Sequence, residues 1–343
     1  LLKQRLGLVF EPNLSGIPNL GHGGTRWQAR RRGGDTRQPA EGRGHAGHGV
    51  GGILSAACAM AGAGHFFQRM HFLDRTGTGS IFADNLEHID DEFLDLRFQG
   101  QANGNLWKCA YGADLSWWGS NPTNYQHIYE LKTNKDSADY SALVHFIDVL
   151  NNTPASSFAC AIQDVFDVDL FLRNIALEIL MGQWDGYAYN KNNFYLYQRE
   201  SDGKMVYLSY DLDNTFGIDW FNINWATRNI YTWSPGNQAR PLYSKLLAVP
   251  YFRDRFTYHM MDLLDSVWNV GALQSLLEDQ QQLISPAALA DAYKGLDYGF
   301  SDQDFLNALQ LAWGAHVKSG VVPYLQNRKT SALTQLQPFL GLP

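Results

Sequence analysis

The chain has 343 residues and a formal net charge of −7, with 45% hydrophobic and 18% charged residues. This composition is typical of a globular protein of about two domains, and it excludes a long disordered chain and a basic nucleic-acid coat protein, so we expect no nucleic-acid partner. Three cysteines without a CxxC pair exclude a disulfide framework and a thiolate zinc site, while one disulfide, such as Cys109–Cys160, stays open.

The N-terminal part of the chain differs from the rest. Residues 21–50 contain only two large apolar side chains, Trp27 and Val50. Their burial cannot offset the entropy of ordering about 30 residues. Residues 1–50 also carry eight basic residues against three acidic ones. We therefore predict an irregular segment over residues 1–65, which is disordered or produced by a shifted reading frame.

The sequence was searched for the patterns of a signal peptide and of a membrane helix. The chain starts at Leu1, and no charged region, apolar core and cleavage site follow one another there, so we expect no signal peptide within this chain. The longest uncharged stretch, residues 50–64, is shorter than the roughly 20 residues of a membrane helix. It is also rich in Gly and Ala, so the sequence predicts no membrane span.

Apolar spacing predicts the elements of residues 66–150. They are two short strands within 70–85 around a turn with Gly77 and Gly79, a helix over 89–98 with Phe93, Leu94 and Leu96 inward, and a helix over 141–152.

Residues 151–343 read as mainly helical, with one hairpin. The expected elements are a buried helix from an N-cap at Asp167 to a stop at Gly182, strands over 192–200 and 205–213 joined by a turn at 202–204, and helices over 241–248, 250–267, 272–284 and 304–318.

Acidic and amide side chains flank this hairpin at both ends. Asp185 and Asn190 lie in the loop before it, and Asp211 and Asp213 follow its second strand. Because a hairpin brings its open ends together, we expect these side chains to face each other. Carboxylate and amide oxygens are the ligands that Mg²⁺ and Mn²⁺ prefer. The alternative is that these residues only form turns, in which Asp and Asn are common.

The spacing of these residues fits phosphoryl transfer. That reaction needs a metal on the phosphate oxygens and a carboxylate that orients the attacking hydroxyl. In protein kinases an Asp, an Asn five residues later, and an Asp-Phe-Gly after a hairpin supply these parts. Here Asp185 and Asn190 are five residues apart, and Asp211 lies a hairpin later with Phe216-Gly217 nearby.

At this point the sequence resembles a known family, the spore coat protein H (CotH) kinases. The resemblance covers about residues 66–265 and rests on several blocks. They are FLRNIALEILMGQWDGYAYNKNNFYLY and GKMVYLSYDLDNTFG within 171–217, GTGSIFADNLEHIDDEFLDLRF at 77–98, NLWKCAYGADL at 105–115, YELKTN at 129–134 and RPLYSKLLAVPYFRDRF at 240–256.

The resemblance implies an α+β, atypical protein-kinase-like fold with two lobes. A small β-rich N-terminal lobe, partly degraded, would cover residues 66–150, and a mainly helical C-terminal lobe would cover residues 151–343. The implied reaction is transfer of the γ-phosphoryl group of ATP to Ser, Thr or Tyr of a protein, with Mg²⁺ or Mn²⁺. The implied location is extracytoplasmic, on secreted, surface or spore coat proteins. No feature of the sequence indicates an oligomer.

The resemblance also implies roles for individual residues. Asp185 would be the catalytic base. The implied metal ligands are Asp211, Asp213 and Asn190. The implied nucleotide-binding residues are Lys132, Glu87, as a partner of a phosphate-binding lysine, and Arg32.

One departure from the family pattern lies near Arg32. Family members usually show Arg-Gly-x-Ser/Thr-Ser/Thr and then Pro-Lys-Lys. Here residues 32–37 begin that pattern, but residues 39–41 read Pro-Ala-Glu. Strands of the small lobe and a phosphate-binding lysine would then be missing.

Two other functions stay open. A pseudokinase, or a structural coat or surface protein, would keep the fold without turnover, and the irregular N-terminal segment favours it. A phosphohydrolase would use the Asp-x-Asp-x-Thr motif at 211–215, with Asp211 as nucleophile and Asp213 as acid/base. That motif follows a strand of a parallel sheet, however, whereas a hairpin predicts an antiparallel one. The tryptophans Trp117, Trp118, Trp220, Trp225 and Trp233 could stack on a ligand or lie in the core.

Overall fold

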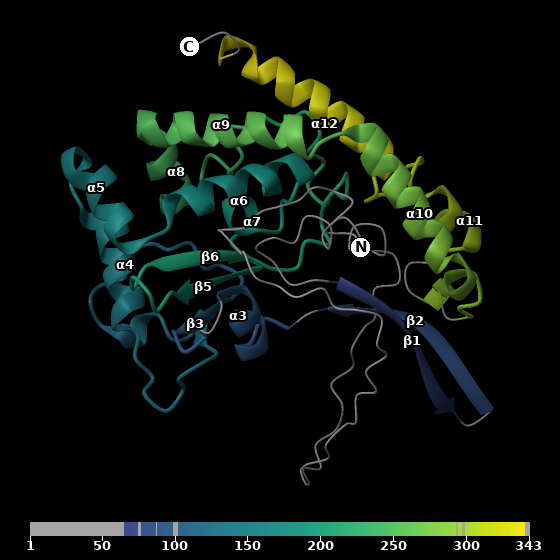
Figure 1. Cartoon of the computed structure of the whole chain (residues 1–343), viewed down its shortest axis with the longest axis horizontal. Helices are drawn as coiled ribbons and strands as arrows, with labels where there is room; N and C mark the ends of the chain where they lie inside the picture. Colours follow the sequence, from purple (N-terminus) through teal and green to yellow (C-terminus); the bar gives the residue numbers. More distant parts are fainter. Residues whose placement is uncertain are drawn as a thin grey trace.

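The fold is α+β (Figure 1). The computed structural model describes residues 65–74, 77–86, 88–98, 102–292, 294–296 and 299–339. Arg32, Glu87 and nearly all of the predicted irregular segment lie outside these residues, so the expectations for them stay predictions. Among the described residues, no helix combines the length and the apolar character that crossing a bilayer requires.

The strands form a hairpin and a sheet, and every pair of neighbouring strands is antiparallel. The hairpin joins β1 (His65–Asp74) to β2 (Gly77–Leu86), so the predicted strand pair is longer than expected and Gly77 and Gly79 lie within β2. The sheet has the order β4-β3-β5-β6. Its strands are β3 (Leu106–Cys109), β4 (Tyr129–Leu131), β5 (Phe194–Gln198) and β6 (Met205–Ser209).

The helices fall into three groups along the chain (Figure 1). One helix lies between β2 and β3, four lie between β4 and β5, and five follow β6 in the part of the chain that the structure describes. Their bounds are α3 (Asp91–Phe98), α4 (Ser141–Asn152), α5 (Ala155–Val165), α6 (Val168–Met181), α7 (Tyr187–Asn190), α8 (Pro241–Ala248), α9 (Pro250–Ser266), α10 (Val270–Leu289), α11 (Asp302–Asn307) and α12 (Val321–Leu336), with single 3₁₀ turns at Pro122–Asn124, Lys294–Leu296 and Gln337–Phe339.

The sheet is covered on both faces. Side chains alternate between the two faces of a strand. One face contributes Leu106, Tyr195 and Val206 to a core with Phe93 and Leu94 of α3. The opposite face contributes Trp107, Phe194, Leu196 and Tyr207 to the main core, which includes α4, α6 and α9. The sheet and its hairpin are therefore fixed between α3 and the helical layer.

The central helix α6 carries the chain into the loop that contains Asp185. Asp167 accepts a hydrogen bond from the Leu170 amide at 3.2 Å, as an N-cap residue does. Gly182 ends the helix in the left-handed conformation, with φ 78°. A Cβ at this position would also collide with the Tyr324 hydroxyl of α12. The predicted bounds of this helix are confirmed.

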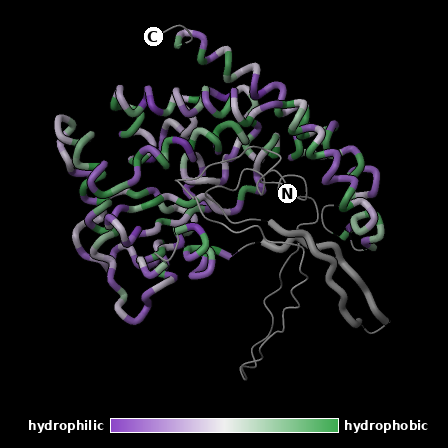
Figure 2. The backbone as a smooth tube through the Cα atoms, viewed as in Figure 1, coloured by the Kyte–Doolittle hydropathy of each residue, from purple (hydrophilic) through white to green (hydrophobic). Residues whose placement is uncertain are grey.

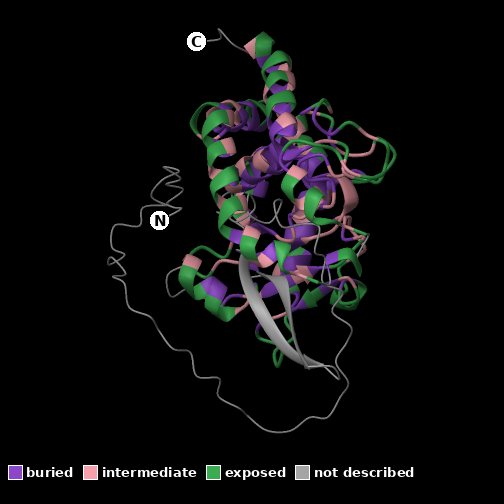
Figure 3. Ribbon diagram, turned by 90° about the vertical axis from the view of Figure 1, so that its right-hand side faces the viewer, coloured by how far each residue is buried: buried purple, intermediate pink, exposed green. Residues whose placement is uncertain are grey.

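Apolar residues recur on the inner faces of the helices, whose outer faces are polar (Figure 2). Turning the molecule shows buried residues concentrated between the helical layer and the sheet (Figure 3). The core is rich in aromatic rings, and Trp225 and Trp233 belong to it, whereas Trp117 and Trp118 are partly buried against it and Trp220 is 50% exposed.

Two expectations about local structure are wrong, and one open possibility is not realised. Leu96 is 66% exposed, because α3 spans only eight residues and Phe93 and Leu94 already fill its inner side. The helix expected over 304–318 ends at Asn307, where the chain turns, and Val317 instead forms bridges with Ile218 and Trp313. The disulfide that stayed open is absent, since Cys109 is free and buried and Cys160 is free and exposed.

Candidate active site

The open end of the β5–β6 hairpin carries the acidic residues. The Tyr210 amide donates to the Asn193 carbonyl at 3.0 Å, which extends the pairing beyond the two strands. Lys191, Asn193 and Asp211 all have positive φ values, of 57°, 53° and 49°. Non-glycine residues adopt this conformation rarely, and its occurrence concentrates at functional sites. Here it turns both chain segments sharply at the same edge of the sheet.

The carboxylate of Asp185 lies within a group of amide side chains. Its Oδ1 accepts from the Nδ2 atoms of Asn190 and, at 3.3 Å, Asn192. Its Oδ2 accepts from the Nδ2 atoms of Asn193 at 3.0 Å and Asn214 at 3.5 Å. Asn214 also donates to Asp213 Oδ1 at 2.8 Å. The structure thus brings Asp185, Asn190 and Asp213 into one hydrogen-bonded group.

Burial raises the pKa of Asp185 above its ordinary value, since a charged carboxylate is disfavoured away from water. The amide donors of Asn190, Asn192 and Asn193 oppose this shift, and the negative charge of Asp211 adds to it. The carboxylates of Asp185 and Asp211 are therefore close enough to repel each other. This is the juxtaposition that the hairpin predicted.

Gln183 fixes the two acidic segments relative to each other, which sequence reasoning missed. Its Oε1 accepts from the Asp185 amide at 3.2 Å, and its Nε2 donates to the Asp211 carbonyl at 2.9 Å. The side chain is 1% exposed. The signal in the sequence was the position of this glutamine, directly after the glycine that ends α6 and directly before Trp184 and Asp185.

A buried carboxyl of α6 lies against the loop that contains Asp185. Glu178 of α6 is 2% exposed, and its Oε1 accepts from the hydroxyls of Tyr207, at 3.0 Å, and Ser209. Its Oε2 has no hydrogen-bond partner and lies against Gly186, where an added Cβ would be 3.0 Å away. Burial raises the pKa of Glu178 to about 7.

We expect the stability of this protein to fall with rising pH because of Glu178. A carboxyl whose folded-state pKa is about 7 rather than 4.5 contributes its full stability below pH 4.5. That contribution is lost as the pH rises through 7. Relative to Glu178→Gln, the wild-type free energy of unfolding should drop by on the order of 3 kcal/mol between pH 4.5 and pH 8. Urea unfolding of both proteins at these pH values checks this, and parallel curves would contradict it.

The donor atoms at the hairpin end suit a hard divalent cation. In the part of the chain that the structure describes, no group of three or more His, Cys, Asp and Glu side chains is arranged for a metal. If Mg²⁺ or Mn²⁺ binds here, as the sequence predicts, Asp211 and Asp213 would need amide and water oxygens as further ligands, which Mg²⁺ accepts readily. A cation beside Asp211 would also offset the repulsion that raises the pKa of Asp185.

Lys108, which the sequence reading did not single out, lies on the strand next to this edge. Lys108 lies on β3, paired with Tyr195 of β5 on one side and Glu130 of β4 on the other. Its Nζ is 5.1 Å from the ring centroid of Tyr210, the residue before Asp211. The signal in the sequence was a single lysine within an apolar run, LWKC.

Lys132 lies farther from the acidic residues than Lys108. It directly follows β4, which is separated from β5 by β3. Its Nζ pairs with Glu130 Oε1 at 3.0 Å, and Glu130 is itself exposed. Neighbouring strands are about 4.8 Å apart, so each intervening strand adds that distance from the hairpin.

Most of the chain matches one protein family. The sequence model of the family described as CotH kinase protein matches residues 85–329. This is more than half of the chain, and it includes the four-stranded sheet with its β5–β6 hairpin and most of the helical layer.

The chain belongs to the CotH kinase family.

Curated relatives have names that refer to coats and to invasion. The chain is 32% identical over 163 residues to the Invasin CotH2 of Rhizopus delemar, which is 43% of this chain and 26% of that protein. It is 26% identical over 186 residues to the Spore coat protein homolog 1 of the same organism, and the match covers 53% of this chain and 30% of that protein. It is 25% identical over 182 residues to the Inner spore coat protein H of Bacillus subtilis, and the match covers 53% of this chain and 48% of that protein. The chain therefore spans about a quarter to a half of these relatives.

The phosphohydrolase alternative loses its structural basis. Its Asp-x-Asp-x-Thr motif would follow a strand within a parallel sheet, whereas β6 pairs antiparallel with β5 and the strand order ends at β6. Asp211 and Asp213 instead lie at the open end of a hairpin in a CotH kinase family member.

Proposed function

We propose that this protein is a CotH-type atypical protein kinase. It transfers the γ-phosphoryl group of ATP to a Ser, Thr or Tyr hydroxyl of a protein, with Mg²⁺ or Mn²⁺. The observation that carries the proposal is the Asp185 carboxylate, held by amide donors from Asn190, Asn192 and Asn193 beside the negative charge of Asp211. A half-buried carboxylate fixed in this way can orient a hydroxyl and accept its proton.

Each group has a role that its position supports. Asp185 accepts the proton of the acceptor hydroxyl at one of its carboxylate oxygens. Asp211 and Asp213 bind the metal, which neutralises charge on the phosphate oxygens when bound. Gln183 holds the Asp185 and Asp211 segments at a fixed separation through its two hydrogen bonds. The roles of Glu87 and Arg32 at the nucleotide remain predictions.

Lys108, rather than Lys132, is the better candidate for the ATP phosphates, because its ammonium group lies beside Tyr210. We expect Lys108→Met to lower kcat/KM for ATP by about 10²-fold, the usual effect of removing one electrostatic contact to a reacting group. The matched control, Lys132→Met, removes an ion pair with the exposed Glu130. Steady-state kinetics with varied ATP measure both, and equal losses in the two variants would contradict the assignment.

The location proposed for this protein is extracytoplasmic, on a cell or spore surface. The relatives carry the names spore coat protein and invasin, and these names are the support for it. The acceptor would accordingly be an extracytoplasmic or coat protein.

The test of the proposed function is transfer of label from γ-labelled ATP to the protein itself and to a generic acceptor protein. We expect label with Mg²⁺ or Mn²⁺ and none with a chelator. The second candidate is a non-catalytic relative that keeps the fold, favoured by the Pro-Ala-Glu at residues 39–41 where family members have Pro-Lys-Lys. Binding of ATP without transfer would identify that candidate and overturn the first.

A further inference from the structure

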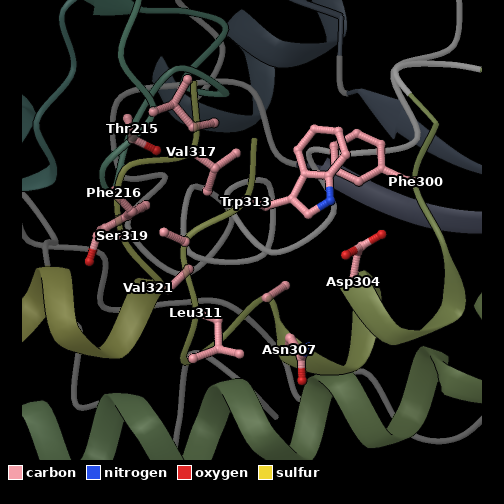
Figure 4. Close-up of a pocket in the computed structure, with 13 residues that line it drawn as sticks. Thr215, Phe216, Phe300, Asp304, Asn307, Leu311, Trp313, Val317, Ser319 and Val321 are labelled. Carbon is pink, nitrogen blue, oxygen red and sulfur yellow. The ribbon is translucent and has the colours of Figure 1, made fainter. Parts of the chain in front are cut away.

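A small pocket lies directly behind the segment that follows Asp213. Its volume is about 110 Å³ (Figure 4). Three parts of the chain form it: residues 215–218, residues 300–308 around α11, and residues 311–321, which lead into α12. The pocket is therefore built partly from the chain segment that carries the acidic residues.

The walls of the pocket are mostly apolar and aromatic. The rings of Phe300 and Trp313 stack with centroids 4.1 Å apart, and Leu311 and Val317 face the same space (Figure 4). Asp304, Asn307 and Ser319 add polar atoms at its margin. Cavities of about 150 Å³ with apolar walls bind benzene. A pocket of this size therefore takes one aromatic ring or one branched aliphatic side chain, and is too small for a nucleotide.

The pocket is connected to the candidate catalytic loop by direct contacts. The indole Nε1 of Trp184, the residue before Asp185, donates to the carbonyl of Ile218 at 3.0 Å, and Ile218 lines the pocket. The Phe216 amide donates to the Met181 carbonyl at 2.8 Å, at the end of α6. The pocket residues Ile218 and Phe216 therefore contact Trp184, next to Asp185, and Met181, four residues before Asp185.

Two exposed aromatic side chains contact residues next to Asp185 and next to the pocket. Phe221, 44% exposed, contacts the Trp184 ring with a centroid distance of 5.1 Å. Trp220, 50% exposed, stacks on His316 with a centroid distance of 3.8 Å, and His316 precedes the pocket residue Val317. Exposed aromatic side chains of this kind are typical of surfaces that bind a polypeptide.

We propose that this pocket binds one large apolar side chain, aromatic or leucine, of the acceptor polypeptide. The proposal rests on the proposed function, since it names the partner of the same site. The acceptor chain would lie over Trp220 and Phe221, with its hydroxyl at Asp185 and its apolar side chain in the pocket that Trp313 and Val317 help to line. Asp304, Asn307 and Ser319 offer acceptors and donors for the backbone of the same polypeptide. One buried apolar anchor beside a polar margin is a common mode of peptide recognition.

The test uses a series of synthetic peptides with one serine in a Gly/Ala background and one phenylalanine placed at successive positions from it. We expect kcat/KM for one or two positions to exceed that of the all-Gly/Ala peptide by about tenfold or more. Ala312 also lines the pocket. Ala312→Trp adds an indole there and should abolish this preference, while transfer to the all-Gly/Ala peptide stays unchanged. The matched control, Leu283→Ala, changes an exposed leucine on α10 and should keep the preference.

A binding measurement separates failure of this proposal from failure of the proposed function. Peptide binding is followed by tryptophan fluorescence without ATP. If wild-type protein transfers no phosphate but binds the phenylalanine peptide and Ala312→Trp does not, the docking site stands and the kinase assignment falls. Transfer without positional preference overturns the docking site, as does equal binding of phenylalanine and Gly/Ala peptides. Equally tight binding of N-acetyl-phenylalaninamide alone would indicate a small-molecule site and would also overturn it.

Discussion

Replacing Asp211 with asparagine should lower phosphoryl transfer by at least about 10³-fold and leave the fold intact. Asparagine keeps the size of the side chain and, like aspartate, tolerates the left-handed backbone at φ 49°. It removes the charge that would hold the metal, and metal stabilisation of phosphoryl charge is worth several kcal/mol, where each 1.4 kcal/mol is about tenfold in rate. Single-turnover transfer at saturating ATP and Mg²⁺ measures the loss.

The same variant has a second consequence, at Asp185. In the metal-free protein the charge of Asp211 raises the pKa of Asp185, so its removal should lower that pKa, which an NMR titration of the Asp185 carboxyl without metal would show. Asp136→Ala is a suitable control, since Asp136 is exposed in a turn near the closed end of the β5–β6 hairpin, opposite to the end that carries Asp211. Full activity of Asp211→Asn would show that the reaction occurs elsewhere.

Replacing Asp185 with asparagine should lower kcat by about 10²–10⁴-fold, the range for a positioned acid or base. The change keeps the volume of the side chain but removes the proton acceptor. ATP binding, measured by calorimetry, should persist, because Asp185 acts on the acceptor hydroxyl and not on the nucleotide.

Asn192→Ala is the matched control for this prediction. It deletes the Nδ2 donor that lies 3.3 Å from Asp185 Oδ1 and keeps the carboxylate. A loss of about tenfold or less is expected, because one neutral hydrogen bond contributes on the order of 1 kcal/mol. A loss in Asp185→Asn no larger than that in Asn192→Ala would contradict the role of Asp185 as base.

The sequence was sufficient for the parts of this site that depend on local pattern. The helix from Asp167 to Gly182 follows from a cap, an apolar face and a glycine stop, all of which are local. The meeting of Asp185 with Asp211 follows from hairpin geometry, because the two ends of a hairpin must lie together.

The rest depends on contacts between distant segments. Gln183 and Glu178 act through partners near residue 210, so neither role is visible from spacing alone. The choice of Lys108 over Lys132 depends on the order of strands in the sheet, which the sequence did not reveal.

Helix prediction failed where tertiary pairing determines the backbone. Val317 forms bridges with Ile218 and Trp313, and Gly314 adopts φ 57°, so the apolar residues of 308–318 do not continue α11. In contrast, α5 and α12 were missed although their buried residues, such as Phe158 and Ile162, keep helical spacing.

The most direct test of the central claim is a comparison of ATP labelled at the γ- or the α-phosphate, with wild-type protein and Asp185→Asn in parallel. A kinase that uses this acidic hairpin should place γ-label, but no α-label, on a Ser, Thr or Tyr hydroxyl of the acceptor, as mass spectrometry would locate. The label should be lost in Asp185→Asn. Label from the α-phosphate, or γ-label that persists in Asp185→Asn, would contradict the account.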